Sequence, residues 1–211
     1  MAVTPANSIL AFIRSLATTE ANRHAPDREL LRRFVVEHDQ LAFATLVQRH
    51  GPMILSLCRR LLGNWHDAED VFQATFLVLA RKSGVRVWHD SIGNWLYLVA
   101  YRLARRAQDG AVRRSALESR AVAREQADPD AEITWRELQG VLDEELTRLP
   151  LKYREPIVHC CLEGATRDEA ARQLGWPLGT LKKRLERGRE MLRSRLARRG
   201  ITLSAALLTP L

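Results

Sequence analysis

The stretch of residues 164–199 restricts the fold more than any other part of the chain, because it contains two helix patterns separated by a sharp break. Thr166 and Glu169 have the S/T-x-x-E spacing of a capping box, which satisfies exposed amides at the start of a helix. Gly175 stands where a left-handed helix end is expected, and Pro177 cannot continue that helix because its ring lacks an N–H. The pattern predicts a short helix, a tight turn and a second helix.

The second of these helices is predicted to have one apolar and one basic face. Its leucines lie on one side at helical spacing, namely Leu178, Leu181, Leu185, Leu192 and Leu196. The other side carries cations, namely Lys182, Lys183, Arg184, Arg187, Arg189, Arg193 and Arg195. A short helix, a turn and a basic helix form the helix-turn-helix pattern, whose second helix enters the major groove of DNA. An ordinary helical hairpin with a solvated basic face is the alternative that this stretch alone leaves open.

Charge supports a nucleic-acid partner. The 211 residues carry a formal net charge of +8, which favours polyanions, nucleic acid first and anionic membrane second. The excess is concentrated at residues 102–124 and again at residues 182–199, and such clustering is what a nucleic-acid footprint requires. Hydrophobic residues make up 46% of the chain and charged residues 27%, which is typical of a globular protein.

The cysteines argue against a disulfide framework and against a metal site. Cys58, Cys160 and Cys161 are an odd number, which fits a reducing cytoplasm, and we interpret them as small buried hydrophobes. His159 adjoins two of them, but no C-x-x-C or H-x-x-H lies nearby, so neither a metal nor another cofactor is expected. No segment has the roughly 20 apolar residues of a membrane span.

The N-terminal half predicts a helical domain over residues 27–107, after an extension at 1–26. A helix from Asp67 to Lys82 begins with Asp67, Glu69 and Asp70, which crowd its first turn. Such acids interact favourably with the helix dipole, so they either only cap the helix or form a surface for a basic protein partner. The residues alone leave these alternatives equal.

A further helix from Asn94 combines aromatic and basic side chains. Trp95 is expected to pack inward, whereas the role of Trp88, in the preceding loop, stays open. The side chains expected on the outside are Tyr97, Tyr101, Arg102, Arg105 and Arg106. Aromatic rings beside arginines suit single-stranded nucleic acid, because bases stack on the rings while guanidinium groups hold phosphates.

The remaining pattern completes an all-α fold of two small helical domains joined by a charged linker at residues 108–133. The second domain, residues 134–199, is expected to contain an apolar helix that ends at Pro150, then a short helix with Pro156 in its first turn, then the helix-turn-helix. Residues 200–211 form a mildly apolar tail.

Two separated motifs resemble one family. The segments LAFATLVQRHGPMILSLCRRLLGN, DAEDVFQATFLVLARK and IGNWLYLVAYRLARR resemble region 2 of bacterial sigma-70 factors. The segment LTRLPLKYREPIVHCCLEGATRDEAARQLGWPLGTLKKRLERGREMLR resembles region 4. In this order, over residues 27–195, they are similar to a compact factor of the extracytoplasmic-function (ECF) type. The amino-acid sequence of the motifs is most similar to a planctomycete-type subgroup.

The resemblance implies a non-enzymatic cytoplasmic protein that binds core RNA polymerase, directs it to promoters and helps to open the duplex at the minus-ten element. Its implied partners are the polymerase beta-prime clamp helices and beta flap, promoter DNA and an anti-sigma factor. The implied polymerase-binding residues are Asp67, Glu69, Asp70 and Gln73. Those implied at the minus-ten element are Trp88, Asn94, Tyr97, Tyr101, Arg102, Arg105 and Arg106. Those implied at the minus-thirty-five element are Thr180, Lys182, Lys183, Arg184 and Arg187.

The sequence departs from the family wording in the second helix of the helix-turn-helix. Lys183 replaces a usual serine and adds a charge at the DNA face. Gly188 replaces a usual alanine, which either weakens the helix by roughly 1 kcal/mol or permits close packing.

Two other classes of protein are alternatives to a sigma factor. A helix-turn-helix regulator with a sensing domain would not explain the acidic helix, and a nuclease-like enzyme lacks a histidine–carboxylate constellation.

Overall fold

The structure is a computed structural model in which residues 25–84, 88, 91–118 and 135–201 are described. The helices are α2 Asp27–Val36, α3 Gln40–Leu62, α4 Trp65–Lys82, α5 Gly93–Glu118, α6 Trp135–Thr147, α7 Leu151–Ile157, the π-helix η2 Val158–Leu162, α8 Arg167–Gln173 and α9 Leu178–Ala197. Strands are absent from this described part, in agreement with the predicted all-α class. Residues 1–24, most of the predicted linker and the tail beyond residue 201 lie outside the described residues.

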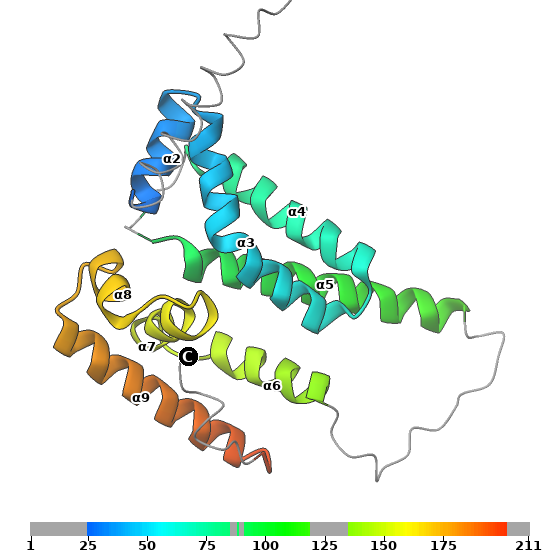
Figure 1. Ribbon diagram of the computed structural model, residues 1–211. Helices are drawn as coiled ribbons and strands as arrows, with labels where there is room; N and C mark the ends of the chain where they lie inside the picture. Colours follow the sequence, from blue (N-terminus) through cyan, green and yellow to red (C-terminus); the bar gives the residue numbers. More distant parts are fainter. Residues whose placement is uncertain (1–24, 85–87, 89–90, 119–134, 202–211) are drawn as a thin grey trace, which may run out of the picture.

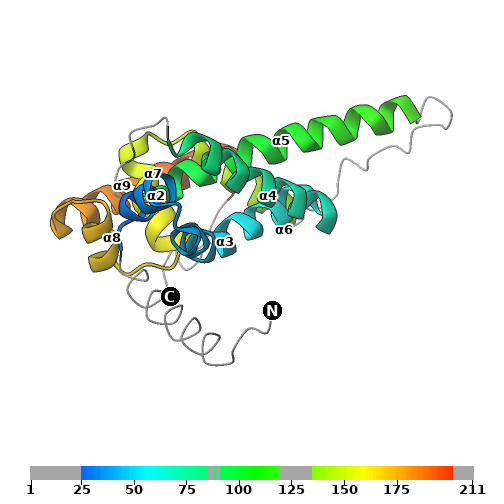
Figure 2. The same ribbon diagram turned by 90° about the horizontal axis from the view of Figure 1, so that it is seen from above.

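Helices α2–α5 form an N-terminal group in which α3 packs on α2, α4 and α5 (Figure 1). Helix α3 is capped by Asp39, whose carboxylate accepts hydrogen bonds from the amides of Leu41 and Ala42. It runs unbroken through Pro52 and ends at Gly63, which has a left-handed φ of 70°. Figure 2 shows the far end of α5 projecting from the rest of the molecule. Because α5 continues to Glu118, the first half of the 108–133 stretch is helical.

Helices α6–α9 with η2 form a C-terminal group around α9, which packs on α6, α7 and α8. The predicted leucine stripe is correct, since Leu181, Leu185, Leu192 and Leu196 are buried and Leu178 is half-buried. The expected position of Pro156 is wrong. Pro150 caps α7 and the helix starts at Leu151, so Pro156 lies in its last turn, next to the π-helical turn.

The two groups share one apolar core. Leu96 of α5 and Leu146 near the end of α6 belong to the same cluster of buried side chains as Val158 of η2. Contacts between α3 and α6 and between α5 and η2 close this junction. The chain therefore holds its two helical groups face to face. Helices α3 and α5 of the N-terminal group contact α6 and η2 of the C-terminal group.

Candidate nucleic-acid interface

The turn between α8 and α9 forms as the sequence predicts. The Thr166 hydroxyl accepts from the Glu169 amide at 3.3 Å, and the Glu169 carboxylate accepts from the Thr166 amide at 2.8 Å. Gly175 has a φ of 63°, and the next amide, that of Trp176, donates to the Ala171 carbonyl at 2.9 Å. This is a Schellman motif, in which two backbone hydrogen bonds satisfy the last carbonyls of α8. The turn sets the direction of α9.

The first half of α9 presents cations to solvent. Lys182, Lys183 and Arg187 are exposed, and Thr180 and Arg184 are half-buried. The guanidinium of Arg184 lies 4.2 Å from the ring centroid of Trp176, so this cation is held by the turn. Arg187 pairs with Glu190 at 2.6 Å, but both side chains are more than half exposed, so the pair contributes little stability.

In the second half of α9, Arg195 forms an ion pair within the protein, whereas Arg193 is exposed. Arg195 lies 3.6 Å from Glu145, a carboxylate of α6 that is only 6% exposed. Beyond the helix, Arg199 contacts the same carboxylate at 2.8 Å and also pairs with Glu144. The basic face of α9, which the sequence predicts to be continuous, is therefore interrupted at Arg195, and most of its exposed cations lie in the N-terminal half.

Helix α4 starts earlier than expected, and this bears on its acidic residues. Asn64 is the cap, its side chain accepting from the His66 amide at 3.1 Å, and the first helical residue is Trp65. Asp67 is therefore the only acid of the first turn, while Glu69 and Asp70 lie in the second turn and are exposed. Because the dipole effect fades beyond the first turn, capping does not explain these two carboxylates.

Apolar side chains that sequence reasoning missed border this acidic surface. Leu77 is 60% exposed and follows the exposed Gln73 by one helical turn of α4. Trp65 is 48% exposed, with the guanidinium of Arg59 4.9 Å from its ring centroid. The helical spacing from Asp70 was the signal that could have placed Leu77 on this face.

Helix α5 divides the predicted minus-ten residues into two sets. Arg102, Arg105 and Arg106 are exposed and Tyr101 is half-buried, as expected for an outer face. The expectation that Tyr97 points outward is wrong, because its side chain is completely buried.

The buried set packs inside the chain. Trp88 is 9% exposed; its indole N–H donates to the Ser83 carbonyl at 3.1 Å, and its ring meets that of Trp95 edge-on, with centroids 4.9 Å apart. Asn94 is 8% exposed, and its side-chain oxygen accepts from Arg154 Nε at 2.7 Å. Because these side chains are buried, they are not available to a base in this structure.

One buried carboxylate explains the position of Tyr97. Asp143 of α6 accepts a hydrogen bond from the Tyr97 hydroxyl at 2.8 Å and two from Arg60 of α3, each at 3.0 Å. The pKa of Tyr97 is raised well above its usual value by burial first and by the Asp143 carboxylate second. A charged side chain of the C-terminal group is thus satisfied by donors of the N-terminal group.

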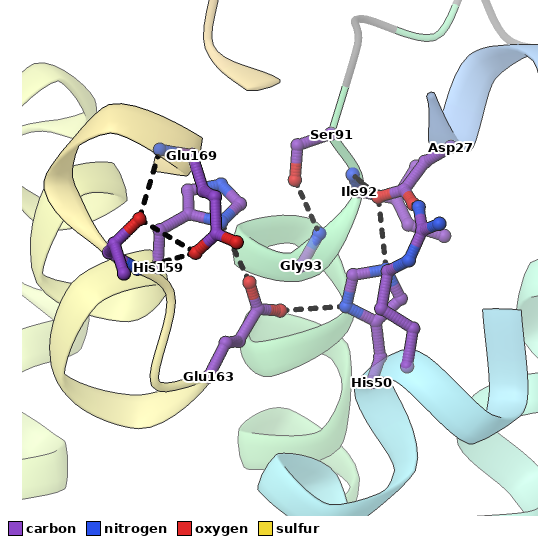
Figure 3. A network of polar contacts seen from close by, with 10 residues as sticks. Asp27, His50, Ser91, Ile92, Gly93, His159, Glu163 and Glu169 are labelled. Carbon is purple, nitrogen blue, oxygen red and sulfur yellow. Dashed lines mark hydrogen bonds and ion pairs between the residues drawn. The ribbon is translucent and has the colours of Figure 1, made fainter. Parts of the chain in front are cut away.

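A second buried network joins the groups near the start of α5 (Figure 3). His50 of α3 has Nε2 2.9 Å from Asp27 Oδ2 and Nδ1 2.7 Å from Glu163 Oε1. Asp27 also pairs with Arg49 and accepts from the Ile92 amide. Burial alone would lower the pKa of His50, but its two carboxylate neighbours raise the pKa to about 10. The imidazole is therefore a buried cation at neutral pH.

The other oxygen of Glu163 faces its own group. His159 Nδ1 lies 2.7 Å from Glu163 Oε2, at ion-pair distance but without hydrogen-bond geometry. Burial would raise the pKa of Glu163, but His50 and His159 hold it well below its usual range. Among the described residues, no cluster of three or more such side chains is arranged to bind a metal ion.

We expect this network to make stability depend on pH. Because folded His50 keeps its proton above its ordinary pKa of 6.5, its contribution is complete below pH 6.5 and is lost as the pH rises towards 10. Glu163 contributes above its ordinary 4.5 and loses its contribution in acid. Urea unfolding at pH 6.5 and pH 9.5 should show a fall in unfolding free energy that His50→Gln reduces. An equal fall in both proteins would contradict the assignment.

Comparison with known proteins decides the family. Residues 46–114 match the family described as Sigma-70 region 2, and residues 139–192 match Sigma-70, region 4. The chain is 31% identical over 174 residues to the ECF RNA polymerase sigma factor SigW of Bacillus subtilis, covering 77% of this chain and 92% of that protein. The chain belongs to the ECF sigma-70 family. A planctomycete subgroup has no support among these matches.

Other matches agree. The sigma factor is 34% identical over 159 residues to ECF sigma factor SigE of Mycolicibacterium smegmatis, covering 72% of this chain but 61% of that protein. Solved structures with similarity include CnrH in complex with the cytosolic domain of CnrY, at 23% identity, a TM-score of 0.39 and coverage of 82% of this chain and 97% of that one. The sigma factor RpoE in complex with the anti-sigma factor NepR from Bartonella quintana is 24% identical, with a TM-score of 0.35. That match covers 74% of this chain and 96% of that one. The family assignment rests on the sequence matches.

As a sigma factor, the chain serves promoter recognition and transcription initiation, and its family consists of initiation factors rather than enzymes. Its partners are core RNA polymerase and promoter DNA. Within the described ranges, no helix is long and apolar enough to cross a membrane.

Proposed function

We propose that this sigma factor contacts polymerase through the second turn of α4 and reads promoters through α5 and α9. The observation that supports this proposal is the exposure of Glu69, Asp70 and Gln73 on one face of α4, in a chain whose net charge is +8. Exposed carboxylates that do not cap the helix suit a basic partner surface, here the beta-prime clamp helices. The C-terminal group would bind the beta flap, which gives polymerase a two-point grip. The site of action would be the cytoplasm, and no cofactor is needed.

At the minus-thirty-five element, we assign DNA reading to the N-terminal half of α9. Thr180, Lys182 and Lys183 lie within its first two turns, where a recognition helix contacts base edges. Arg187, one turn further, is held only by an exposed ion pair and can exchange Glu190 for a phosphate. Arg184 is positioned by Trp176 and would be fixed before binding.

Replacing Lys182 or Arg187 with alanine should weaken binding to duplex promoter DNA and reduce the slope of log affinity against log salt by about 1 for each lost phosphate contact. Arg193→Ala is the matched control, because Arg193 is an exposed cation of the same helix beyond its reading half. Fluorescence anisotropy over a salt series measures both quantities. A salt slope that is unchanged in K182A and R187A would exclude these residues from the interface.

At the minus-ten element, some of the proposed side chains are exposed and others are buried. Arg102, Arg105 and Arg106 can hold phosphates of the melted strand, with the half-buried Tyr101 ring beside them for stacking. Asn94 and Tyr97 stay in the proposal as base contacts, on the condition that Arg154 and Asp143 of the C-terminal group move away from them. Trp88 also stays in the proposal, on the condition that it leaves its contacts with Ser83 and Trp95 in the N-terminal group. An anti-sigma factor is a further proposed partner of this sigma factor.

Co-elution with core polymerase tests the proposal against the regulator alternative. A sigma factor should elute with core polymerase and bind duplex DNA weakly alone. A chain that binds duplex tightly and never joins polymerase would be a helix-turn-helix regulator instead.

A further inference from the structure

Trp176, in the turn between α8 and α9, is fixed by contacts on both sides. Its amide donates to the Ala171 carbonyl of α8 at 2.9 Å, and the following Pro177 disfavours a helical backbone at this position. Its indole ring is half-buried and packs against the apolar core, as do Leu174 and Leu178. Figures 1 and 2 both show this turn at an outer end of the molecule. The turn therefore holds one large aromatic side chain in a fixed place beside the start of α9.

Arg184 of α9 lies over this ring. Its guanidinium carbon is 4.2 Å from the centroid of the Trp176 ring, and the side chain is half-buried. The corresponding distance between Arg59 and Trp65 is longer, at 4.9 Å. A guanidinium over an indole is attracted by the negative face of the ring. Within the described residues, Arg184 has no carboxylate partner, so its N–H donors are not used in an ion pair.

The position of Arg184 on α9 places it among the proposed DNA readers. It follows Thr180 by four residues and precedes Arg187 by three, so these side chains are neighbours on one side of the helix. Arg187 is tied to Glu190 in an exposed pair, and each lysine of this half offers only a point charge. Arg184 instead combines a planar fork of donors with a fixed ring behind it. Such a guanidinium suits a pair of adjacent acceptors, either guanine O6 and N7 or two phosphate oxygens.

We propose that Trp176 is a positioning residue for DNA reading, which holds the Arg184 guanidinium ready for a bidentate contact with a pair of DNA acceptors. This inference rests on the proposed function, since it concerns the same half of α9. A long side chain loses rotamer freedom when it binds, and this loss weakens a complex. The Trp176 ring imposes part of that loss in the free protein. DNA binding then orders less, and the contact forms only in the geometry that the ring permits.

Two replacements of Trp176 separate its aromatic face from its packing. Trp176→Leu keeps an apolar side chain against the core but has no aromatic face, whereas Trp176→Phe keeps such a face for the cation. Arg184→Ala removes the proposed contact itself. Arg193→Ala is the control for losing an exposed cation of α9, beyond the half that reads DNA. Urea unfolding shows whether each variant remains folded under the conditions of the binding assay.

The binding assay uses each variant in complex with core RNA polymerase. The probe is a duplex library of random sequence, from which the wild-type complex selects its preferred minus-thirty-five element. Fluorescence anisotropy with the selected duplex should show about three- to tenfold lower affinity for W176L and an affinity within about twofold of wild type for W176F. In the R184A background, W176L should have no further effect, because the ring acts through Arg184. R193A should select the same element as wild type.

The same assay identifies which acceptors Arg184 contacts. If they belong to guanine, W176L and R184A should both lose the preference for guanine at one position of the selected element. If they belong to phosphate, both variants should keep every base preference, and R184A should reduce the salt slope by about 1. Either result supports a bidentate contact that depends on Trp176.

Three results would overturn the inference. The first is wild-type affinity in W176L, and the second is W176F binding as weakly as W176L. The third is an equal loss of affinity from W176L in the wild-type and R184A backgrounds, which would make Trp176 a purely structural residue. A wild-type complex that selects no element would overturn the assignment of α9 to DNA reading, and this inference with it. Selection of an element without any effect of Trp176 would overturn the inference alone.

Discussion

Replacing Glu69 and Asp70 with lysine should lower affinity for core RNA polymerase by about tenfold or more, because a like-charged contact replaces an attractive one. Both side chains are exposed in the second turn of α4, beyond the reach of the dipole, so the unfolding free energy should change little. Affinity is measured by fluorescence anisotropy of a labelled sigma factor titrated with core polymerase.

Asp109→Lys is the control for this charge reversal. Asp109 is an exposed carboxylate of α5 in the same helical group, and each such replacement changes the net charge equally. The polymerase affinity of each single variant, E69K and D70K, is compared with that of D109K. If all three bound polymerase as wild type does, the second turn of α4 would not belong to the interface.

Gly188→Ala should destabilise the chain by about 1–3 kcal/mol, the usual cost of overpacking a close contact. Helix propensity alone predicts the opposite, a gain of up to about 1 kcal/mol. The geometry decides the sign. A Cβ on Gly188 would lie 2.7 Å from the backbone carbonyl oxygen of Tyr153 and 3.0 Å from Ile157 Cδ1. Backbone cannot move aside cheaply, so α9 would separate from α7.

Gly140→Ala is the matched control for Gly188, since it lies within α6 and its Cβ would meet nothing within 4 Å. It should be neutral or stabilising by up to about 1 kcal/mol. Urea unfolding followed by circular dichroism gives both free energies. Stabilisation by both alanines would mean that α7 and α9 do not pack closely at Gly188, and the weakened-helix alternative would hold.

Features set by near neighbours in the chain could be predicted from the sequence. The capping box at Thr166, the left-handed Gly175 and the leucine stripe of α9 each depend on residues within a turn or two, and all three formed as expected. One error of position is also local. The sequence analysis expected this helix to begin at Asp67, but Asn64 caps it and Trp65 is its first residue, which moves Glu69 and Asp70 out of the first turn.

Features set by distant partners could not be predicted in this way. Helical periodicity assumes one packed face, but α5 is covered on two sides, so Tyr97 was wrongly placed outside. Its partner Asp143 is 46 residues away, and Glu163 is 113 residues from His50. Nothing in the spacing of isolated polar residues indicates which of them meet across two helical groups.

Run-off transcription most directly tests the central claim that this chain selects promoters for polymerase. Genomic fragments of the source organism are transcribed by core RNA polymerase with and without the chain, and RNA 5′ ends are mapped. The account predicts discrete 5′ ends that appear only with the chain, share two sequence elements upstream and are lost with the Glu69 and Asp70 replacements. The same scattered 5′ ends with and without the chain would contradict it.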